Sequence, residues 1–563
     1  MVRSTQAHDV SDHVLIDGEL LPSDTVLDAD VCIVGSGPAS LAMAQELLES
    51  KLTVVVLERG PLAGSVGEDL ASELEFESPD FPSPLRALHN EYGGMAAIWN
   101  SVLGDDVTPA ARYLPMDPID FEPRDWVPHS GWPVTFEEVA SYYGRARKRC
   151  GIRPFDFHGP MPDTGRTPLR TSSGALVTRL EQLGPATAFT RDSLLEVSTS
   201  EHVRVVTNAI AVEVVSPKGT DDGMARTAVR SHGGLALTVR SRAVVLAGGA
   251  IETARLLLNS VAESPSGLGN RFDNVGRFYM DHPRVSLGLG TLTPEGLTRV
   301  MDLYSPHHLG GELLNGKLKL SETVLRRDAL LNGNAQIVRK FSSGQLAGLR
   351  SASIAVNSLR RRQDLTGVPK HVVVAARHAV PVARQLALLS LTRPGARGQS
   401  LLKWSTAAER SFELNYQPEQ APNSDNRVTL GQRRDAFGYR IARLDWRWSE
   451  IDLHSIRRAR QIFASEFLAE GIGELVDTEL DTLRGEGGQE TPETAHHHLG
   501  TTRMHDDPRH GVVDRNCKLH DSSSVYVAGG SVFPTGGYAN PTLTIVALAI
   551  RLADELKRSL TTR

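Results

Sequence analysis

The sequence predicts an α/β fold, because it contains three strand–turn–helix units. The first is DVCIVGSGPASLAMAQELLES over residues 30–50, and the second is SRAVVLAGGAIETARLLLNS over residues 241–260. The third, SVYVAGG followed by NPTLTIVALAIRLADELK, lies near the C-terminal end. Each apolar run suits a buried strand, the glycines suit a turn, and the residues that follow favour a helix. The second unit can join the same sheet as the first.

Length and composition are those of a globular protein with two or more compact lobes. The chain has 563 residues, of which 40% are hydrophobic and 23% charged, and its net charge of -6 gives no support for nucleic-acid binding. No apolar run approaches the roughly 18–20 residues that span a bilayer, and the N-terminus lacks the apolar core of a secretory signal. We therefore expect a cytoplasmic protein of bacterial type without a transmembrane segment, and we leave its oligomeric state open.

The three cysteines, Cys32, Cys150 and Cys517, lie far apart in the sequence. This spacing excludes a zinc knuckle of the CxxC type and a four-cysteine iron–sulfur site. Free thiols also fit a reducing compartment.

The first unit has the features of a dinucleotide-binding motif. Gly35 allows the tight turn after the strand, and Gly37 lets the backbone approach a pyrophosphate at the start of the helix near Pro38. Ser40 replaces the third glycine and is still small enough for close helix–strand packing. Glu58 ends the next strand, LTVVVLERG, about 20 residues further on, where a carboxylate accepts hydrogen bonds from a ribose. A mere tight turn is the alternative.

Further glycines favour FAD over NAD as the nucleotide. The stretch after ERG is long and does not repeat, and a resident flavin needs more contacts along the chain. One candidate is EYGGMAAIWN over residues 91–100, in which Gly93 and Gly94 allow backbone amides to approach a planar ligand. An ordinary glycine turn is the alternative for this stretch.

The C-terminal unit adds a helix whose start can face the cofactor. We expect a strand at 525–528 and a helix over 542–557, with Pro541 at the first helical position. The positive end of the helix dipole can then stabilise an anionic part of the ring system. A strand at 207–215, a turn at 274–283, a turn and strand at 419–430 and a long helix within 444–470 complete the expected elements.

A basic segment from about 335 to 400 differs in character from the rest of the chain. Apolar blocks alternate there with arginine and lysine, and Asp364 is the exception among almost no acids. We expect a helical insertion with a solvated basic face. A lid over an anionic substrate, or a surface that touches a membrane or a partner, are the alternatives.

The motifs together resemble the glucose–methanol–choline (GMC) flavoprotein oxidoreductases, over nearly the whole length of the chain. The likeness rests on the first unit, YGGMAAIW, VVLAGGAIETARLLL, VGRFYMDHP, PNSDNRVTL, HHLGTTRM and GGSVFPTGGYANPTLTIVALAIRLA. It implies a Rossmann-type FAD-binding domain assembled from discontinuous segments, and a substrate-binding domain with an antiparallel sheet. We assign residues 25–130, 195–290 and 505–563 to the former and residues 131–194 and 291–504 to the latter.

The same resemblance implies which residues hold the cofactor. The set is Gly35, Gly37, Ser40, Glu58 and Arg59 at the ADP half, Val212 at the adenine, Gly93, Gly94 and Met95 beside the flavin, Gly530 and Ser531 near the pyrophosphate or ribityl chain, and Pro541 and Thr542 near the pyrimidine end of the ring. The chain looks most similar to bacterial pyranose-oxidase-like and glycoside-oxidising members. Pyranose oxidases carry a flavin-linking histidine just before the tryptophan, where this chain has Ile98, so we expect non-covalent FAD.

The resemblance also implies a catalytic pair, which is His497 in the HxxGT stretch and Asn540 before the last helix. A neutral histidine suits the base that removes a hydroxyl proton, because its ordinary pKa is about 6.5. An asparagine amide can position the substrate oxygen without competing for the proton. We expect His496 and His498 to be packed or solvated neighbours rather than metal ligands, because two histidines alone make a poor zinc site. We expect His282 to pack.

The expected reaction is oxidation of an alcohol, in which the flavin takes the hydride. We predict a secondary hydroxyl of a sugar, glycoside or sugar-containing metabolite, with Glu413, Gln417, Gln420 and His498 as candidate substrate contacts. Surface strand positions are the alternative for the first three. A hydrophobic or aryl alcohol, or a flavin-binding member of the family that oxidises nothing, are the other hypotheses. The acceptor, O2 or another, is open, although no CxxCH motif for a c-type haem is present.

Overall fold

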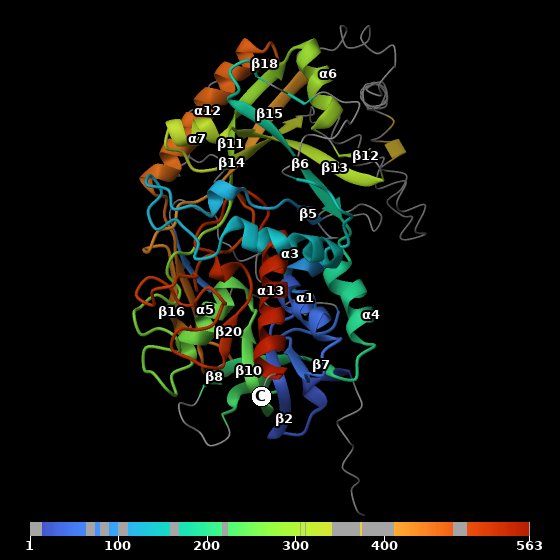
Figure 1. Ribbon diagram of the computed structural model, residues 1–563, viewed down its shortest axis with the longest axis vertical. Coiled ribbons are helices and arrows are strands. Elements are labelled where there is room, and N and C mark those ends of the chain that lie inside the picture. The colour runs from blue at the N-terminus through green and yellow to red at the C-terminus, as the bar shows by residue number, and fades with distance from the viewer. Residues whose placement is uncertain are drawn as a thin grey trace, which may run out of the picture.

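The structure is a computed structural model that describes residues 14–63, 74–78, 89–99, 111–157, 168–169, 171–216, 223–304, 306–309, 311–339, 372–373, 376, 410–476 and 493–561. Two lobes are stacked along the long axis of the molecule (Figure 1). One is built on a mostly parallel sheet, and the other on an antiparallel sheet covered by helices. The predicted basic segment at about 335–400 lies almost wholly outside the described residues.

The first lobe contains the predicted α/β sheet. Its strands run in the order β1-β7-β3-β2-β10-β9-β8, and β20 pairs with β10. At its centre β2 (Thr25–Val34) lies parallel to both β3 (Val54–Leu57) and β10 (Ala236–Leu246). The other strands are β1 (Leu15–Asp17), β7 (Val203–Thr207), β8 (Ala209–Val215), β9 (Ala225–Ser231) and β20 (Val525–Val527). The single strand expected at 207–215 is divided, because Asn208 adopts a left-handed backbone with φ of 51°.

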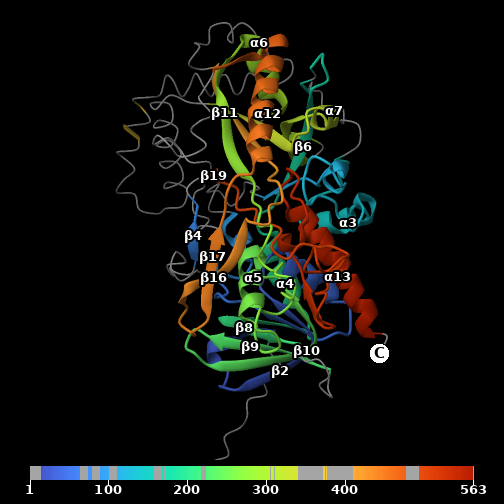
Figure 2. The same ribbon diagram turned by 90° about the vertical axis from the view of Figure 1, so that its left-hand side faces the viewer.

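Three helices of this lobe follow the predicted strand–turn–helix units. They are α1 (Pro38–Leu47), α5 (Gly249–Asn259) and α13 (Thr542–Thr561). α1 packs on α13, whereas α5 packs on β8 (Figure 2). α13 begins at Thr542 as expected and runs four residues further than 557, and Pro541 lies just before it rather than inside it: the carbonyl of Pro541 accepts the hydrogen bond from Ile545 N at 2.8 Å. The turns after β2 and β10 therefore meet at one edge of the sheet, where doubly wound folds bind ligands.

The second lobe contains the predicted antiparallel sheet, in the order β18-β11-β15-β14-β13-β6-β5, with β12 beside β13 and β19 beside β11. Its strands are β5 (Ala111–Tyr113), β6 (Leu176–Gly184), β11 (Pro283–Leu292), β12 (His307–Leu309), β13 (Glu312–Leu320), β14 (Gly333–Arg339), β15 (Ser411–Pro418), β18 (Gly473–Leu475) and β19 (Glu493–Thr494). β5 lies within 25–130, which we assigned to the FAD-binding domain, yet it pairs with β6 of this sheet.

Alternation along these strands produces one apolar and one polar face. Leu180, Leu318 and Phe412 belong to a core that also includes Phe463 and Phe467 of α12 (Glu450–Ala469). α6 (Pro294–Leu303) contributes to the same core, so both helices cover the apolar face. The polar positions between these residues point away from this core, toward the other lobe.

The remaining strands and α-helices of the described residues comprise a small sheet and three further helices. A small sheet contains β4 (Leu74–Glu77), β16 (Arg427–Arg434) and β17 (Arg440–Asp445), and the remaining helices are α3 (Phe136–Arg149), α4 (Ser193–Val197) and α7 (Glu322–Arg327). α3 lies within 131–194, which we assigned to the substrate-binding domain, but it packs against α13 of the first lobe. Among the described residues, no helix has the length and apolar character needed to cross a membrane.

Candidate active site

A cavity of about 1150 Å³ lies at the edge of the parallel sheet where β2 and β10 end. Its lining begins at the glycine turns after these strands and extends to the C-terminal histidines and the start of α13. Ligand pockets of small molecules rarely exceed about 1,000 Å³, so this cavity is large enough for a dinucleotide together with a small substrate.

The glycine turn after β2 fits a pyrophosphate. Gly35 has a φ of 99°, and a Cβ there would lie 2.7 Å from the carbonyl oxygen of Ala247, so a side chain would be excluded. A Cβ on Gly37 would meet nothing within 4 Å, so the backbone of this residue faces open space at the start of α1. Ser40 is fully buried and does not line the cavity. It therefore has the predicted packing role.

Glu58 lies at the end of β3 and lines the cavity as predicted. Its Oε2 accepts hydrogen bonds from Ser36 N at 3.1 Å and Ser36 Oγ at 2.5 Å, and its Oε1 accepts from Gly60 N at 2.8 Å. Burial raises the pKa of this carboxyl to about 7, although these hydrogen bonds oppose the shift. The contacts fix the carboxylate where a ribose hydroxyl could bind it.

The other predicted cofactor residues divide into those that line the cavity and those behind it. Arg59, Gly94, Met95, Val212, Gly530, Pro541 and Thr542 line it. Gly93 and Ser531 do not. Gly93 instead donates its N–H to Ser36 Oγ at 3.1 Å, and its φ of 97° with a close Phe189 carbonyl excludes a side chain. Ser531 is fully buried behind the turn.

The cavity lining fits FAD by its own chemistry. Thr253 lines the cavity near the end of β10, and its buried Oγ1 has no hydrogen-bond partner among the described residues. The open backbone at Gly37, the fixed Glu58 carboxylate and this hydroxyl are suited to a pyrophosphate, a ribose and a further polar group, respectively. The residues would hold the adenosine diphosphate half of FAD here and leave the flavin beside Met95.

At the other end of the cavity, His497 lies against Asn540, as predicted. Asn540 Nδ2 is 3.5 Å from His497 Nε2, and both residues line the cavity. The pKa of His497 lies well below its usual range, because the ring is buried and because His282, when protonated, and the charges of Arg284 and Lys317 oppose its protonation. The ring is therefore neutral near pH 7.

His282 contacts the predicted base, although the sequence suggested only a packing role for it. Its Nδ1 lies 2.8 Å from His497 Nδ1, and its Nε2 lies 2.8 Å from the carbonyl oxygen of Gly537. A carbonyl only accepts, so His282 Nε2 carries a proton. Burial also lowers the pKa of His282, so the neutral ring has an acceptor at Nδ1. His497 Nδ1 must then donate, and its Nε2 keeps a free lone pair toward Asn540.

Asp281 holds the backbone on both sides of this histidine pair. Its Oδ1 accepts hydrogen bonds from His282 N at 2.7 Å and from His497 N at 2.8 Å. Thr494 Oγ1 donates to the other oxygen, and Gln420 Oε1 accepts from Asp281 N at 2.9 Å. The segment before β11 and the histidine segment are thereby fixed side by side.

The structure separates His497 from its two neighbours. His496 adopts a left-handed backbone with φ of 58°, which breaks the alternation expected of an extended segment. His498 Nε2 is 3.8 Å from Asp281 Oδ2, its ring lies beside Tyr279, and burial lowers its pKa to about 4. All three histidines line the cavity, but only His497 contacts Asn540 among the described contacts. The described residues contain no group of three or more ligating side chains suited to a metal ion.

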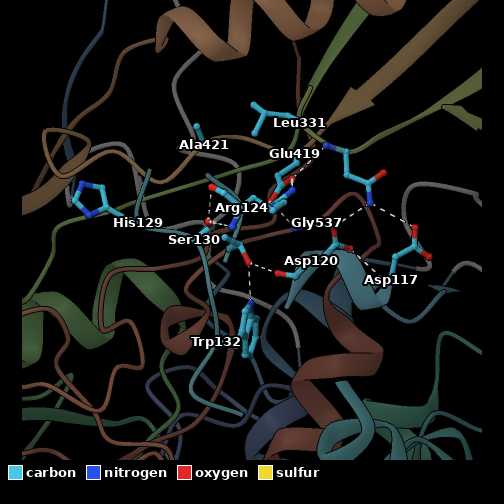
Figure 3. A network of polar contacts seen from close by, with 12 residues as sticks. Asp117, Asp120, Arg124, His129, Ser130, Trp132, Leu331, Glu419, Ala421 and Gly537 are labelled. Carbon is cyan, nitrogen blue, oxygen red and sulfur yellow. Dashed lines mark hydrogen bonds and ion pairs between the residues drawn. The ribbon is translucent and has the colours of Figure 1, made fainter. Parts of the chain in front are cut away.

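A buried ion pair fixes the loop that carries Asn540 (Figure 3). Arg124 donates from Nη1 to Glu419 Oε2 at 2.8 Å and from Nη2 to Oε1 at 2.7 Å, and both side chains are fully buried. Gly537 N donates to the same Oε1 at 3.3 Å. A Cβ on Gly537 would lie 2.5 Å from Asp120 Oδ2, and its φ is 56°, so the loop can approach only as glycine. Glu419 and His282 thus hold the backbone N–H and the carbonyl of the same residue, Gly537.

The predicted substrate contacts Glu413 and Gln417 of β15, and Gln420 just after it, do not lie on the cavity surface. Gln417 Nε2 donates to the carbonyl of Tyr538 at 3.1 Å, and Gln420 binds Asp281 N and Trp446 Nε1. Glu413 lies on β15 opposite Leu289 and Val338. None of the three lines the cavity, whereas His498 does. Asp281, Arg124 and Glu419 were not singled out from the sequence. Two of them lie in stretches that were considered there: Asp281 is part of MDHP, and Glu419 directly precedes Gln420.

The chain is similar to known oxidoreductases over nearly its whole length. Residues 422–549 match the family model described as GMC oxidoreductase. The 2-methyl-1,2-propanediol dehydrogenase of Mycolicibacterium austroafricanum is 24% identical, covering 94% of this chain and 95% of that protein. Paromamine 6'-oxidase of Streptomyces fradiae is 24% identical, covering 95% and 92%, and the fructose dehydrogenase large subunit of Gluconobacter japonicus is 22% identical, covering 96% and 99%.

The fold is also that of a solved structure. Pyridoxine 4-oxidase of Mesorbium loti superposes with a TM-score of 0.52 at 15% identity, covering 93% of this chain and 98% of that one. Three findings point the same way: the fold is similar to that of pyridoxine 4-oxidase, the cavity fits FAD, and a relative is named 2-methyl-1,2-propanediol dehydrogenase. The chain therefore contains a region, residues 422–549, that matches the GMC oxidoreductase family model, and the relatives it resembles over nearly its whole length are named as dehydrogenases and oxidases.

Proposed function

We propose that the protein holds FAD non-covalently and oxidises a secondary hydroxyl of a sugar, glycoside or sugar-containing metabolite to a ketone. The observation that carries the proposal is the His497–Asn540 contact, with the free Nε2 lone pair of His497 facing the amide inside the cavity. A relative named fructose dehydrogenase large subunit supports a sugar as the substrate class.

The chain's residues would handle the proton of the reaction. His497 Nε2 removes the hydroxyl proton, and Asn540 Nδ2 donates a hydrogen bond to the alcohol oxygen as its charge develops. The C–O bond becomes a carbonyl as the carbon loses its hydride. Bound FAD supplies the acceptor for that hydride, so the two electrons leave the substrate and one proton remains on His497. The resulting imidazolium still donates from Nδ1 to His282, so the ring does not need to turn.

The polar face of the antiparallel sheet supports a polyol substrate. Glu181, Asn315 and Lys317 alternate with the core leucines of β6 and β13, on the face opposite α12. Arg112 and Arg284, from β5 and β11, line the cavity on this side. A sugar needs several hydrogen-bonding groups around one reacting carbon, and an apolar pocket wall would favour a hydrophobic alcohol instead.

Non-covalent attachment rests on Ile98. Its side chain lines the cavity and contains no nucleophile. Acid precipitation of the purified protein should therefore release all of the flavin into the supernatant. Flavin retained in the pellet would contradict this part of the proposal, and His89, which lines the same cavity, would be the residue to map by peptide mass spectrometry.

The reaction is tested by anaerobic flavin bleaching. The holoprotein is mixed with a panel of neutral sugars, glycosides, and aliphatic and aryl alcohols, and absorbance near the flavin maximum is followed; air is then admitted. Bleaching by sugars or glycosides supports the proposal, and recovery in air identifies O2 as an acceptor. Bleaching only by apolar alcohols would replace the sugar with a hydrophobic substrate, and no bleaching at all would show that the protein does not oxidise alcohols of these classes.

A further inference from the structure

Two arginines line the cavity at its alcohol-binding end. Arg284 follows His282 by two residues, and alternate side chains of an extended segment point to the same side, about 7 Å apart. Since the His282 ring contacts His497, Arg284 lies beside the proposed base, and its charge opposes protonation of that base. Arg112 reaches the same cavity from β5, at the other edge of the sheet. Both guanidiniums therefore border the space where the substrate would lie.

One carboxylate lies between two of the cations on this side. Glu181 Oε2 pairs with Lys317 Nζ at 2.9 Å, and Glu181 Oε1 accepts from Asn315 Nδ2 at 2.8 Å. Arg112 Nε is farther from the same Oε1, at 3.8 Å, and the Arg112 side chain is 32% exposed. Lys317 and Glu181 are buried and neutralise each other. Of the two cations beside Glu181, Arg112 is therefore the one that is accessible to a ligand, and its contact with Glu181 is the longer one.

The carboxylates of the cavity lining lie elsewhere. Within the described lining they are Glu58, Glu252 and Asp435. Glu58 ends β3, while Glu252 and Asp435 both pair with Arg255 of α5. Glu58 and Glu252 thus belong to the nucleotide lobe, and Asp435, in the turn between β16 and β17 of the small sheet, is held against that lobe by Arg255. At the substrate end the described lining contains Arg112 and Arg284 and no carboxylate, and Glu493 lies opposite Arg284 where β19 pairs with β11. Arg112 is therefore the arginine to which we assign the binding of an anion.

From this distribution we infer that the substrate carries an anionic group, a carboxylate or a phosphate ester, which Arg112 binds with Arg284 beside it while the reacting hydroxyl lies at His497. The inference rests on the proposed alcohol oxidation, whose substrate class it narrows to acidic sugars and their glycosides. Guanidinium groups suit this role because they bind carboxylate and phosphate through two parallel hydrogen bonds.

The test compares matched probes that differ in one charged group. Methyl β-D-glucuronide is paired with methyl β-D-glucoside, glucose 6-phosphate with glucose, and glucosamine supplies a cationic arm. Two readouts are taken for each at low salt: kcat/KM for anaerobic flavin reduction, and the Kd from the flavin difference spectrum of the holoprotein. At least one anionic probe should exceed its neutral partner by about tenfold or more, as expected for a charge-assisted hydrogen bond. The better of the two anions identifies carboxylate or phosphate.

Variants assign the preference to the arginines. Arg112→Gln and Arg284→Gln should each reduce the anion-to-neutral ratio of kcat/KM about tenfold, chiefly through KM and Kd of the anionic probe. Arg558→Gln is the matched control: it removes the same charge at a side chain that is 73% exposed in the last turn of α13. Because Arg112 and Arg284 lie on different strands, one variant remains informative if the other does not fold.

The outcomes separate this inference from the proposed function. Turnover of neutral and anionic probes at equal efficiency, or a preference for glucosamine, would overturn the anion site and leave alcohol oxidation standing. Anion binding that is lost in Arg112→Gln without any flavin reduction would support the anion site and overturn alcohol oxidation of these probes. An anion preference that persists in both arginine variants would show that other groups create it and would overturn the assignment.

Discussion

The Nδ1 atoms of His282 and His497 lie 2.8 Å apart, and the second ring nitrogen of His282 lies 2.8 Å from the Gly537 carbonyl. This chain of contacts permits only one direction of donation when both rings are neutral: from His497 to His282, and from His282 to the carbonyl. The tautomer of the proposed base is therefore set by a backbone oxygen two contacts away.

Replacing His497 by alanine should abolish flavin reduction by the substrate and leave the flavin bound. The reason is that Nε2 is the only ring nitrogen beside Asn540, whereas the nucleotide end of the cavity is formed by other segments. Stopped-flow anaerobic reduction and the visible spectrum measure the two quantities. A reduction rate equal to that of the unchanged protein would refute the assignment of the base.

The reductive rate should persist as the pH falls below 6.5. Burial and nearby positive charges lower the pKa of His497, so the ring stays neutral, and able to accept a proton, at pH values where an exposed histidine is protonated. The pH profile of kcat/KM measures this directly. A profile that declines with an apparent pKa near 6.5 or above would show that an ordinary histidine limits the reaction.

Replacing His282 by leucine should slow reduction about 10²-fold or more, whereas glutamine should keep the rate within about tenfold. Leucine cannot accept from His497 Nδ1, so the proton could move to Nε2 and block the base. Glutamine offers both an acceptor and a donor in a similar place. A role limited to packing predicts equal losses for both variants, together with an unchanged pH profile, so the profile is recorded for each.

Replacing Glu419 by glutamine should destabilise the protein strongly. Arg124 would keep its buried charge without this counter-ion, which costs about 3–5 kcal/mol in proteins, and one amide oxygen would replace the two carboxylate oxygens that accept from Arg124 and Gly537 N. Denaturant unfolding of the holoprotein measures the loss. The double variant Arg124→Met/Glu419→Leu removes both charges and should recover part of the stability. If it is no more stable than Glu419→Gln, the unpaired charge is not the cause.

Replacing Glu58 by glutamine should weaken FAD binding about tenfold or more, since an amide presents a single acceptor oxygen while Ser36 and Gly60 occupy both carboxylate oxygens. Titration of the apoprotein with FAD, followed by quenching of flavin fluorescence, gives the Kd. Glu49→Gln is the control, because Glu49 is exposed and lies outside the cavity. Equal affinities for the two variants would count against a ribose contact.

Replacing His498 by glutamine should flatten the loss of stability in mild acid. Burial lowers its folded pKa to about 4, whereas the unfolded residue titrates near 6.5, so the unfolded state takes up the proton first as the pH falls. This linkage removes about 2 kcal/mol of unfolding free energy between pH 7 and pH 5. Urea unfolding at both pH values measures it. An identical pH dependence in the variant would show that other groups cause the loss.

Local sequence patterns predicted the elements better than the contacts between them. The first strand–turn–helix unit, the second unit and α13 appear where alternation and glycine turns place them. The division at Asn208 was missed because a left-handed asparagine inside a β-branched run leaves no periodic signal. The family motif gave His497 and Asn540, and the structure brings them together.

The supports of the catalytic pair could not be read from the sequence, because they act across long separations. His282 lies 215 residues before His497, and Arg124 lies 295 residues before Glu419. A buried charge pair or a histidine–histidine contact has no local periodicity, so nothing near Arg124 indicates its partner. Glu413, Gln417 and Gln420 show the converse: a polar strand suggested the substrate wall, but none of these three residues lines the cavity.

The doubly held residue Gly537 has a consequence for how the enzyme matures. Its N–H is held by a residue of the antiparallel lobe and its carbonyl by a residue that precedes β11, while the loop itself belongs to the C-terminal segment. Contacts of such long sequence separation form only after the chain has closed its large loops. The nucleotide end also needs distant segments, because the turn at Gly35 lies against Ala247. A newly made chain should therefore become active only after its C-terminal segment has joined both lobes.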